Sequence, residues 1–267
     1  MGSLPLDLLR PIVDNLADDS RSLLAVSLAS RELRVEGQRI LFRKVAFPFG
    51  QDRHTKFLTA ITCSSLLASL VEECHQFHLP IKGRQSEQFC GLACRGLQAM
   101  VNLKILRLHT WDGRASAQIF HGCTFQLEVL EWNNPEDVEQ ILEFLQTQPQ
   151  LRTLRVFWIP PELDTSRICP RLQVLHGDRN TINAFLPGHR ITSLKWTPNK
   201  EEVGLDDGSI DHLAEEFHHI RFFSLGGAFS GPRLDLVIPH LRAVEVLELV
   251  GLETIAVPVC LKKFSLR

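Results

Sequence analysis

The sequence contains none of the short motifs that mark the common catalytic sites. It has no Gly-x-Ser-x-Gly turn for a hydrolase nucleophile and no His-Glu-x-x-His pair for zinc. Residues 226–231 have the glycine spacing of a phosphate-binding loop, but Pro232 and Arg233 follow where lysine and a hydroxyl residue are required. Residues 74–78 hold a cysteine and two histidines, without a second ligand pair at the spacing of a zinc site. We therefore expect no enzyme activity, no cofactor and no metal.

An excess of charge of either sign is also absent. The formal net charge of −2 gives no reason to expect nucleic acid or a membrane surface as a partner. Residues 1–5 lack the basic region of a secretory signal, and the apolar run at 66–71 is far too short to span a bilayer. The seven cysteines are scattered and odd in number, and no Asn-x-Ser/Thr acceptor occurs. We therefore expect reduced thiols in an intracellular protein, cytoplasmic or nuclear.

A short hydrophobic phrase recurs nine times along the chain. It consists of an apolar residue, two variable residues, an apolar residue, one polar residue and a third apolar residue. Successive phrases begin 17 to 29 residues apart, which is close to the length of leucine-rich repeats. The phrases begin with Cys74, Leu103, Leu127, Leu151, Leu172, Ile191, Ile220, Val244 and Leu261. Such repeats form solenoids, which usually bind other macromolecules.

Each phrase predicts a short strand with its apolar pair facing inward, because side chains alternate between the two faces of a strand. Return segments that are often helical connect the strands. The clearest begins at Asn134-Pro135-Glu136-Asp137, a cap followed by proline and acidic residues, and we expect Ile141, Leu142, Phe144 and Leu145 on its buried side. This alternation predicts an α/β solenoid with a curved parallel sheet.

The residue between the last two apolar positions of each phrase is expected on the concave surface, and it is polar in all nine. Exposed positions are usually polar, so this alone does not indicate binding. Nearby apolar residues such as Phe157 make the mixture more typical of a protein-binding surface. The residues that we expect to contact a protein target are Arg107, Glu131, Arg155, Phe157, His176 and Lys195.

Residues 1–47 do not share the repeat and predict a small domain of three helices. Asp18-Asp19-Ser20 supplies capping acceptors for the second helix, which we expect to present Leu23, Leu24, Ser27 and Leu28 on one face. The third helix is expected from Glu32 to Arg43. So small a core is hard to stabilise alone, so we expect it to dock on the solenoid or on a partner. Residues 48–53 are interpreted as a joint between the two parts. The solenoid is expected over residues 54–267, and we expect it to begin with one long helix over 54–73.

Three pieces of the N-terminal segment occur in a fairly specific order: Leu4-Pro5 at its head, Ser27-Leu28-Ala29-Ser30-Arg31 in its middle and Leu41-Phe42-Arg43 at its exit. With these pieces the segment resembles the F-box of fungal-type proteins in which leucine-rich repeats follow. Leu33 stands where such sequences often have tryptophan.

The resemblance implies the substrate-recognition subunit of an SCF-type cullin-RING ubiquitin ligase. The F-box would bind the Skp adaptor, which links it to the cullin scaffold, and the repeats would bind a protein target. The residues that the resemblance assigns to the adaptor are Leu4, Pro5, Leu8, Leu9, Ile12, Leu23, Leu24, Leu28 and Leu41. The sequence does not divide them between the domain's own core and an interface.

Two alternatives stay open at this point. The N-terminal helices could merely cap the solenoid of an interaction scaffold without a ligase role, and an enzyme could draw its catalytic groups from distant positions. The last phrase, Leu261, Phe264 and Leu266, has no return segment after it. We expect an exposed strand edge there, unless a partner or further sequence covers it.

Overall fold

A computed structural model describes residues 6–47, 51–76, 84–109, 117–134, 137–198, 211–226 and 234–250. They fall into two compact units, residues 1–127 and 128–267, which we describe separately. Both units are α/β, and the strand pairs described within each are parallel. The α/β class and the parallel sheet are therefore as expected. The division does not test the expected boundary at 48–53, and the phrase at 261–266 lies outside the described residues.

The first unit begins with the three expected helices, α1 (Leu6–Asp14), α2 (Ser20–Ala29) and α3 (Arg31–Arg43). The Asp19 side chain accepts hydrogen bonds from the backbone N–H groups of Arg21 and Ser22, which confirms the predicted cap of α2. Ser30 caps α3 in the same way, through the N–H of Leu33. Two helices therefore begin where the sequence places a side-chain acceptor.

The face of α2 that carries Leu23, Leu24, Ser27 and Leu28 is only half buried. Leu23 and Ser27 are buried, whereas Leu24 and Leu28 are 57% and 79% exposed. The reason is the close approach of α3: a Cβ on Gly37 would lie 2.1 Å from Ser27 Oγ and 3.3 Å from Leu23 O. Only the stripe containing Leu23 and Ser27 fits against this glycine, so the neighbouring leucines turn outward.

The sheet of the first unit starts earlier than predicted, because α3 leads directly into a strand. The remaining elements of this unit are β1 (Lys44–Phe47), α4 (Gln51–Cys63), α5 (Ser65–Ser69), β2 (Glu73–Gln76), α6 (Arg84–Ala99), β3 (Ile105–His109) and the 3-10 helix η1 (Ala117–Phe120). The long helix expected over 54–73 is wrong. Ser64 ends the first part and caps α5 through the N–H of Leu67, and the chain is extended by Glu73.

The first repeat phrase was placed three residues too late. Cys74 pairs with Leu106, the second apolar position of the next phrase, and not with Leu103. The residue that corresponds to Leu103 is therefore Val71, which is fully buried. The predicted phrase was misplaced because Cys74, Phe77 and Leu79 imitate the spacing of the repeat.

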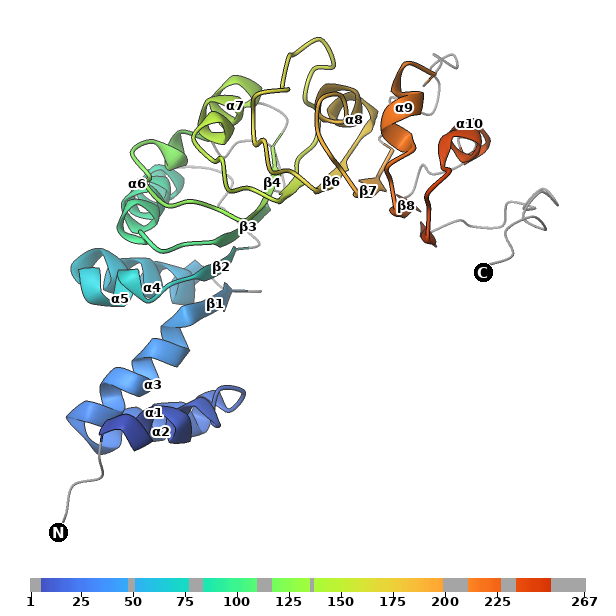
Figure 1. Cartoon of the computed structure of the whole chain (residues 1–267). Helices are drawn as coiled ribbons and strands as arrows, with labels where there is room; N and C mark the ends of the chain where they lie inside the picture. Colours follow the sequence, from blue (N-terminus) through green and yellow to red (C-terminus); the bar gives the residue numbers. More distant parts are fainter. Residues whose placement is uncertain are drawn as a thin grey trace. The chain divides into compact units, whose positions relative to one another are not determined.

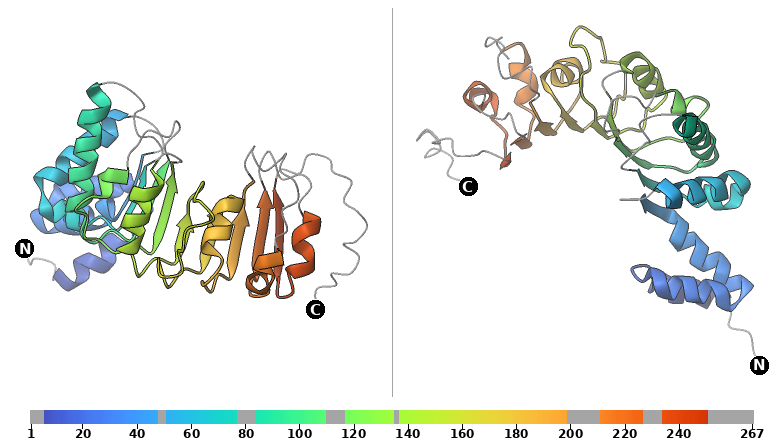
Figure 2. Two further views of the ribbon diagram at one scale, coloured as in Figure 1. Left: turned by 90° about the horizontal axis from the view of Figure 1, so that it is seen from above. Right: turned by 180° about the vertical axis from the view of Figure 1, so that it is seen from behind.

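In the second unit, strands and return segments alternate, and each strand pairs with the next in sequence from β4 to β9. Figure 1 shows α7, α8, α9 and α10 on one side of the strands, and Figure 2 shows the strands side by side from a second direction. The elements are β4 (Val129–Asn133), α7 (Val138–Gln146), β5 (Thr153–Arg155), β6 (Val174–Gly177), α8 (Arg179–Phe185), β7 (Ser193–Trp196), η3 (Asp211–Leu213), α9 (Ala214–Phe217), β8 (Phe222–Gly226), α10 (Leu234–Val237), η4 (Ile238–His240) and β9 (Val246–Val250).

The core of the second unit is made by the apolar positions of the phrases. The middle positions lie opposite one another along the sheet, and those from β4 to β8 are fully buried: Leu130, Leu154, Leu175, Leu194 and Phe223. Trp132 and Trp196, at third positions, are also buried, as expected. Gly177 interrupts this pattern because a Cβ there would lie 2.8 Å from the carbonyl oxygen of Val156 and 2.7 Å from Thr181 Cγ2.

Candidate binding surfaces

Helices α1 and α2 carry apolar stripes that the first unit does not cover. On α1, Leu8 and Ile12 are 52% and 51% exposed, one helical turn apart. On α2, Leu24 and Leu28 have the same spacing and are more exposed still. Single exposed leucines are common on protein surfaces, but paired i, i+4 stripes on two neighbouring helices are typical of an interaction surface.

The inward-facing residues of the same helices supply the local core. Leu9 and Val13 on α1 are buried, as are Leu23 and Ser27 on α2. Of the nine residues that the resemblance assigns to the adaptor, Leu8, Ile12, Leu24 and Leu28 are thus free to contact a partner, whereas Leu9 and Leu23 are core. Leu41 is half-buried, and Leu4 and Pro5 lie outside the described residues. Val35 on α3, at 56% exposed, was not predicted.

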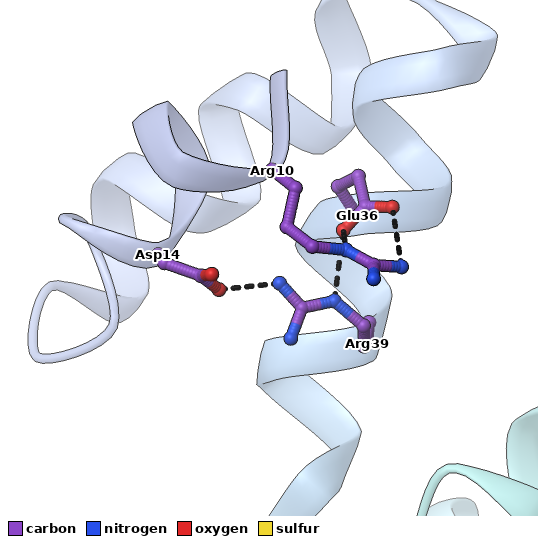
Figure 3. Close-up of polar contacts among 4 residues, drawn as sticks. All are labelled: Arg10, Asp14, Glu36 and Arg39. Atoms are coloured by element: carbon purple, nitrogen blue, oxygen red, sulfur yellow. Dashed lines mark hydrogen bonds and ion pairs between the residues drawn. The ribbon is translucent and has the colours of Figure 1, made fainter. Parts of the chain in front are cut away.

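A cluster of ion pairs holds α1 against α3 (Figure 3). Arg10 donates from Nε and Nη2 to the two oxygens of the Glu36 carboxylate, at 3.2 and 3.4 Å. Arg39 donates from Nε to Glu36 at 2.8 Å and from Nη2 to Asp14. Burial favours the neutral form of Glu36, but the hydrogen bonds from Arg10 and Arg39 outweigh it and lower the pKa of this carboxyl. These ion pairs hold α1 on α3 in the orientation that leaves Leu8 and Ile12 exposed.

The second candidate surface is the face of the sheet opposite the buried row in the second unit. The in-between residues of the phrases lie side by side across it, because Glu131, Arg155, His176, Lys195, Ser224 and Glu248 pair successively in register. We call these six residues the polar row. The register brings together four of the predicted target-binding residues of this unit, Glu131, Arg155, His176 and Lys195. Phe157 follows β5 and was expected to be exposed, but it is 8% exposed, so its ring is largely buried beneath this face.

Arg155 is the centre of the contacts in this row. Its Nη1 lies 3.4 Å from the Glu131 carboxylate, and its guanidinium lies 5.8 Å from the centre of the Phe157 ring. The Phe157 ring meets His176 edge to face at 5.3 Å. The side chain of Arg155 is only 32% exposed, so it is less free than the sequence suggested.

His176 is neutral at physiological pH. Burial is the main cause, and the neighbouring charges of Arg155 and Lys195 act in the same direction, so the pKa of this histidine falls to about 3. Its Nε2 lies 2.9 Å from Thr197 Oγ1, which holds the ring in place. The positive charge of the row therefore comes from Arg155 and Lys195 alone.

The sixth predicted target residue, Arg107, belongs to the first unit. It lies on β3 opposite His75 of β2, with 3.5 Å between Arg107 Nη1 and His75 Nδ1. His75 thus lies in the ladder where the phrase that begins with Cys74 predicts His78, and His78 lies outside the described residues. The structure therefore groups five of the six predicted residues and leaves Arg107 in the other unit.

One structural feature near the polar row, the backbone conformation of Trp158, was not predicted from the sequence. Trp158 has a φ of 61°, in the left-handed region that a bulky residue rarely adopts. Its backbone N–H donates to Oδ2 of Asp178, a fully buried carboxylate whose Oδ1 accepts the N–H of Thr181 at the start of α8. Asp178 follows Gly177, the position where the phrase is imperfect, and that irregularity was the only signal.

Neither a metal centre nor a membrane span emerges from the described part of the chain. Among those residues, no three His, Cys, Asp or Glu side chains gather closely enough to hold a metal ion. No helix described there combines the length and apolar character needed to cross a bilayer. Among the described cysteines, Cys74 and Cys169 are buried, and burial raises the pKa of each thiol to about 12, which makes them poor nucleophiles.

Comparison with known proteins adds no family to this description. No model of a protein family matches the chain, and no curated protein matches it.

Proposed function

We propose that this chain is the substrate-recognition subunit of an SCF-type cullin-RING ubiquitin ligase. In this proposal the N-terminal helices are an F-box that binds the Skp adaptor, and the sheet face of a leucine-rich-repeat solenoid binds a protein target. Other subunits carry out ubiquitin transfer, and the chain itself is not an enzyme.

The observation that carries the proposal is the division of the N-terminal leucines. Helices α1 and α2 have a complete inner row, Leu9 and Val13 with Leu23 and Ser27, and still expose four large apolar side chains. A domain whose only task was to close its own core would not need the second set. Burying each such leucine at an interface contributes roughly 1.5–3 kcal/mol, which is enough for a stable complex when several act together.

The test is capture of a purified Skp adaptor by the full chain. Replacing Leu24 and Leu28 together by aspartate should weaken capture at least about tenfold, because two buried apolar contacts become unpaired charges. The folded state should be little affected, since both side chains are exposed. Leu66→Asp is the matched control: Leu66 is 65% exposed on α5, and its replacement should leave capture unchanged. Unchanged capture by the folded double variant would sink the proposal.

A scaffold without a ligase role is favoured by a different observation. Helix α3 continues without a break into β1, and β1 pairs with β2 in the same parallel register as the later strands. Such continuity is what capping helices at the end of a solenoid provide. Absence of adaptor and cullin from the protein purified from its own cells, with other partners present, would favour the scaffold.

A further inference from the structure

The charged side chains of the polar row differ in whether the structure describes a partner for them. Arg155 is paired with Glu131, and Glu248 accepts a hydrogen bond of 2.6 Å from Ser224 Oγ. Lys195, between them, lies within ion-pair distance of no carboxylate that the structure describes. Its nearest neighbours in the ladder are His176, which is neutral, and Ser224, whose hydroxyl hydrogen already serves Glu248. Among the described residues, the Lys195 ammonium group thus has no carboxylate as its counter-ion.

A second row runs beside the polar row on the same face, and we call it the apolar row because four of its six residues are valine or phenylalanine, the others being Thr153 and Ser193. Its members stand two positions before the polar-row residue of each strand, and the register places them side by side: Val129, Thr153, Val174, Ser193, Phe222 and Val246. Side chains two positions apart share a face, so this row lies next to the polar row. Around Lys195 it supplies Val174 on β6 and Phe222 on β8, both partly exposed. The face therefore offers a cation flanked by apolar side chains.

We propose that this face binds an extended acidic segment of a protein target, with a carboxylate at Lys195 and an adjacent apolar side chain over Val174 and Phe222. In an extended segment, successive side chains project in different directions, and a bulky apolar residue near the acid can reach the neighbouring row. The proposal rests on the proposed function in one respect, namely that the sheet face holds the target.

Charge complementarity selects an acidic peptide over the other occupants. Arg155 is paired with Glu131, and Glu248 accepts the Ser224 hydroxyl, so Lys195 is the charge of the row that has no described partner, and a basic segment would meet it with like charge. Nucleic acid binding depends on many cations along a phosphate backbone, whereas this face has two and the whole chain has a net charge of −2. The apolar row also favours a protein partner, because phosphates and sugars gain little from valine and phenylalanine.

The experiment is a selection of short random peptides displayed on phage against the full-length chain. Selected peptides should be enriched in Asp and Glu next to large apolar residues. A peptide from this selection, labelled with fluorescein, should bind Lys195→Glu at least about tenfold more weakly than the natural chain, because attraction becomes repulsion. Added salt should weaken its binding to the natural chain. A labelled single-stranded oligonucleotide should not compete.

Two variants control for other causes. Arg221→Glu makes the same charge change at an exposed position just before β8, outside both rows, and should bind the peptide like the natural chain. Lys195→Gln removes the charge without adding one, and it should also bind the peptide more weakly than the natural chain. It serves as the test if circular dichroism shows that Lys195→Glu is misfolded. A selection without acidic enrichment, no selected peptide at all, competition by the oligonucleotide, or equal binding by folded Lys195 variants would overturn the proposal. Adaptor capture is measured separately, so its failure would count only against the ligase role.

Discussion

At the scale of single residues, the structure assigns a structural role to Asp178 that its place in the sequence hides. This carboxylate has no exposed surface, and it accepts N–H groups from both Trp158 and Thr181. It therefore holds the unusual backbone of Trp158 and the first turn of α8 together. Positions that combine left-handed backbone with a buried acceptor persist only where the surroundings stabilise them.

We predict that Asp178→Ala lowers the free energy of unfolding by about 1–3 kcal/mol, because two buried N–H groups lose their acceptor. Asp178→Asn should cost less, since one side-chain oxygen remains to accept one of the two bonds. Urea unfolding followed by circular dichroism measures both. Equal stability of Asp178→Ala and the natural chain would show that water or another group replaces the carboxylate.

Glu36 gives a prediction about pH. Its pKa in the folded chain is lower than the ordinary value, so the folded state holds the ionised form more firmly than the unfolded state does. The resulting stability is present above the ordinary pKa and is lost as the pH falls through the lowered value. The difference in unfolding free energy between the natural chain and Glu36→Gln should therefore be largest near neutral pH and should shrink in acid. A difference that is independent of pH would contradict the ion-pair role drawn in Figure 3.

At the scale of elements, the packing of α2 on α3 depends on one glycine. A methyl group on Gly37 would collide with Ser27 Oγ, whose hydrogen bond to Leu23 O fixes it in place at 2.7 Å. The same contact decides which leucines of α2 face outward, so a small residue on one helix determines which side chains of another are exposed.

Gly37→Ala should consequently destabilise the chain by about 1–3 kcal/mol, although alanine is the better helix former. Adding Ser27→Ala should recover part of this loss, since the oxygen that clashes is removed and the remaining contacts are 3.3 Å or longer. Thermal unfolding of the two single variants and the double variant measures the coupling. Additive effects would mean that the helices move apart instead of sharing this contact.

At the scale of the whole molecule, the two candidate surfaces lie in different compact units. Leu24 and Leu28 belong to the first unit, and Lys195 belongs to the second. A recognition subunit needs both surfaces, each with its own partner.

We therefore predict that substitutions at the two surfaces act independently. A chain with Leu24→Asp, Leu28→Asp and Lys195→Glu should lose adaptor capture and acidic-peptide binding by the same factors as the separate variants. Affinity measurements with each partner alone provide the comparison. An adaptor affinity that changes with Lys195→Glu in a folded chain would reveal coupling between the surfaces, which nothing in either unit leads us to expect.

The sequence by itself determined the features that arise from local periodicity. The spacing of Leu127, Leu130 and Trp132 and its repeats predicted parallel strands with a buried row, because alternation along a strand decides which side chains leave water. The cap at Asp19 was likewise readable, since a helix start depends on only a few neighbouring residues. The cap expected at Asn134 was wrong: α7 begins at Val138, its N-cap is Asp137, and that side chain makes no capping hydrogen bond.

Only the tertiary structure decided which of several compatible patterns is used. The spacing of Cys74, Phe77 and Leu79 fits the repeat better than that of Val71, Cys74 and Gln76, whose third position is polar, yet pairing with β3 selects the latter. Leu23 and Leu24 are equally apolar, and the approach of Gly37 determines which is buried. Which described side chains lie beside Lys195, a neutral histidine and a serine, likewise depends on the register of β6, β7 and β8. These outcomes depend on contacts between residues distant in sequence, whose free energies a local pattern does not contain.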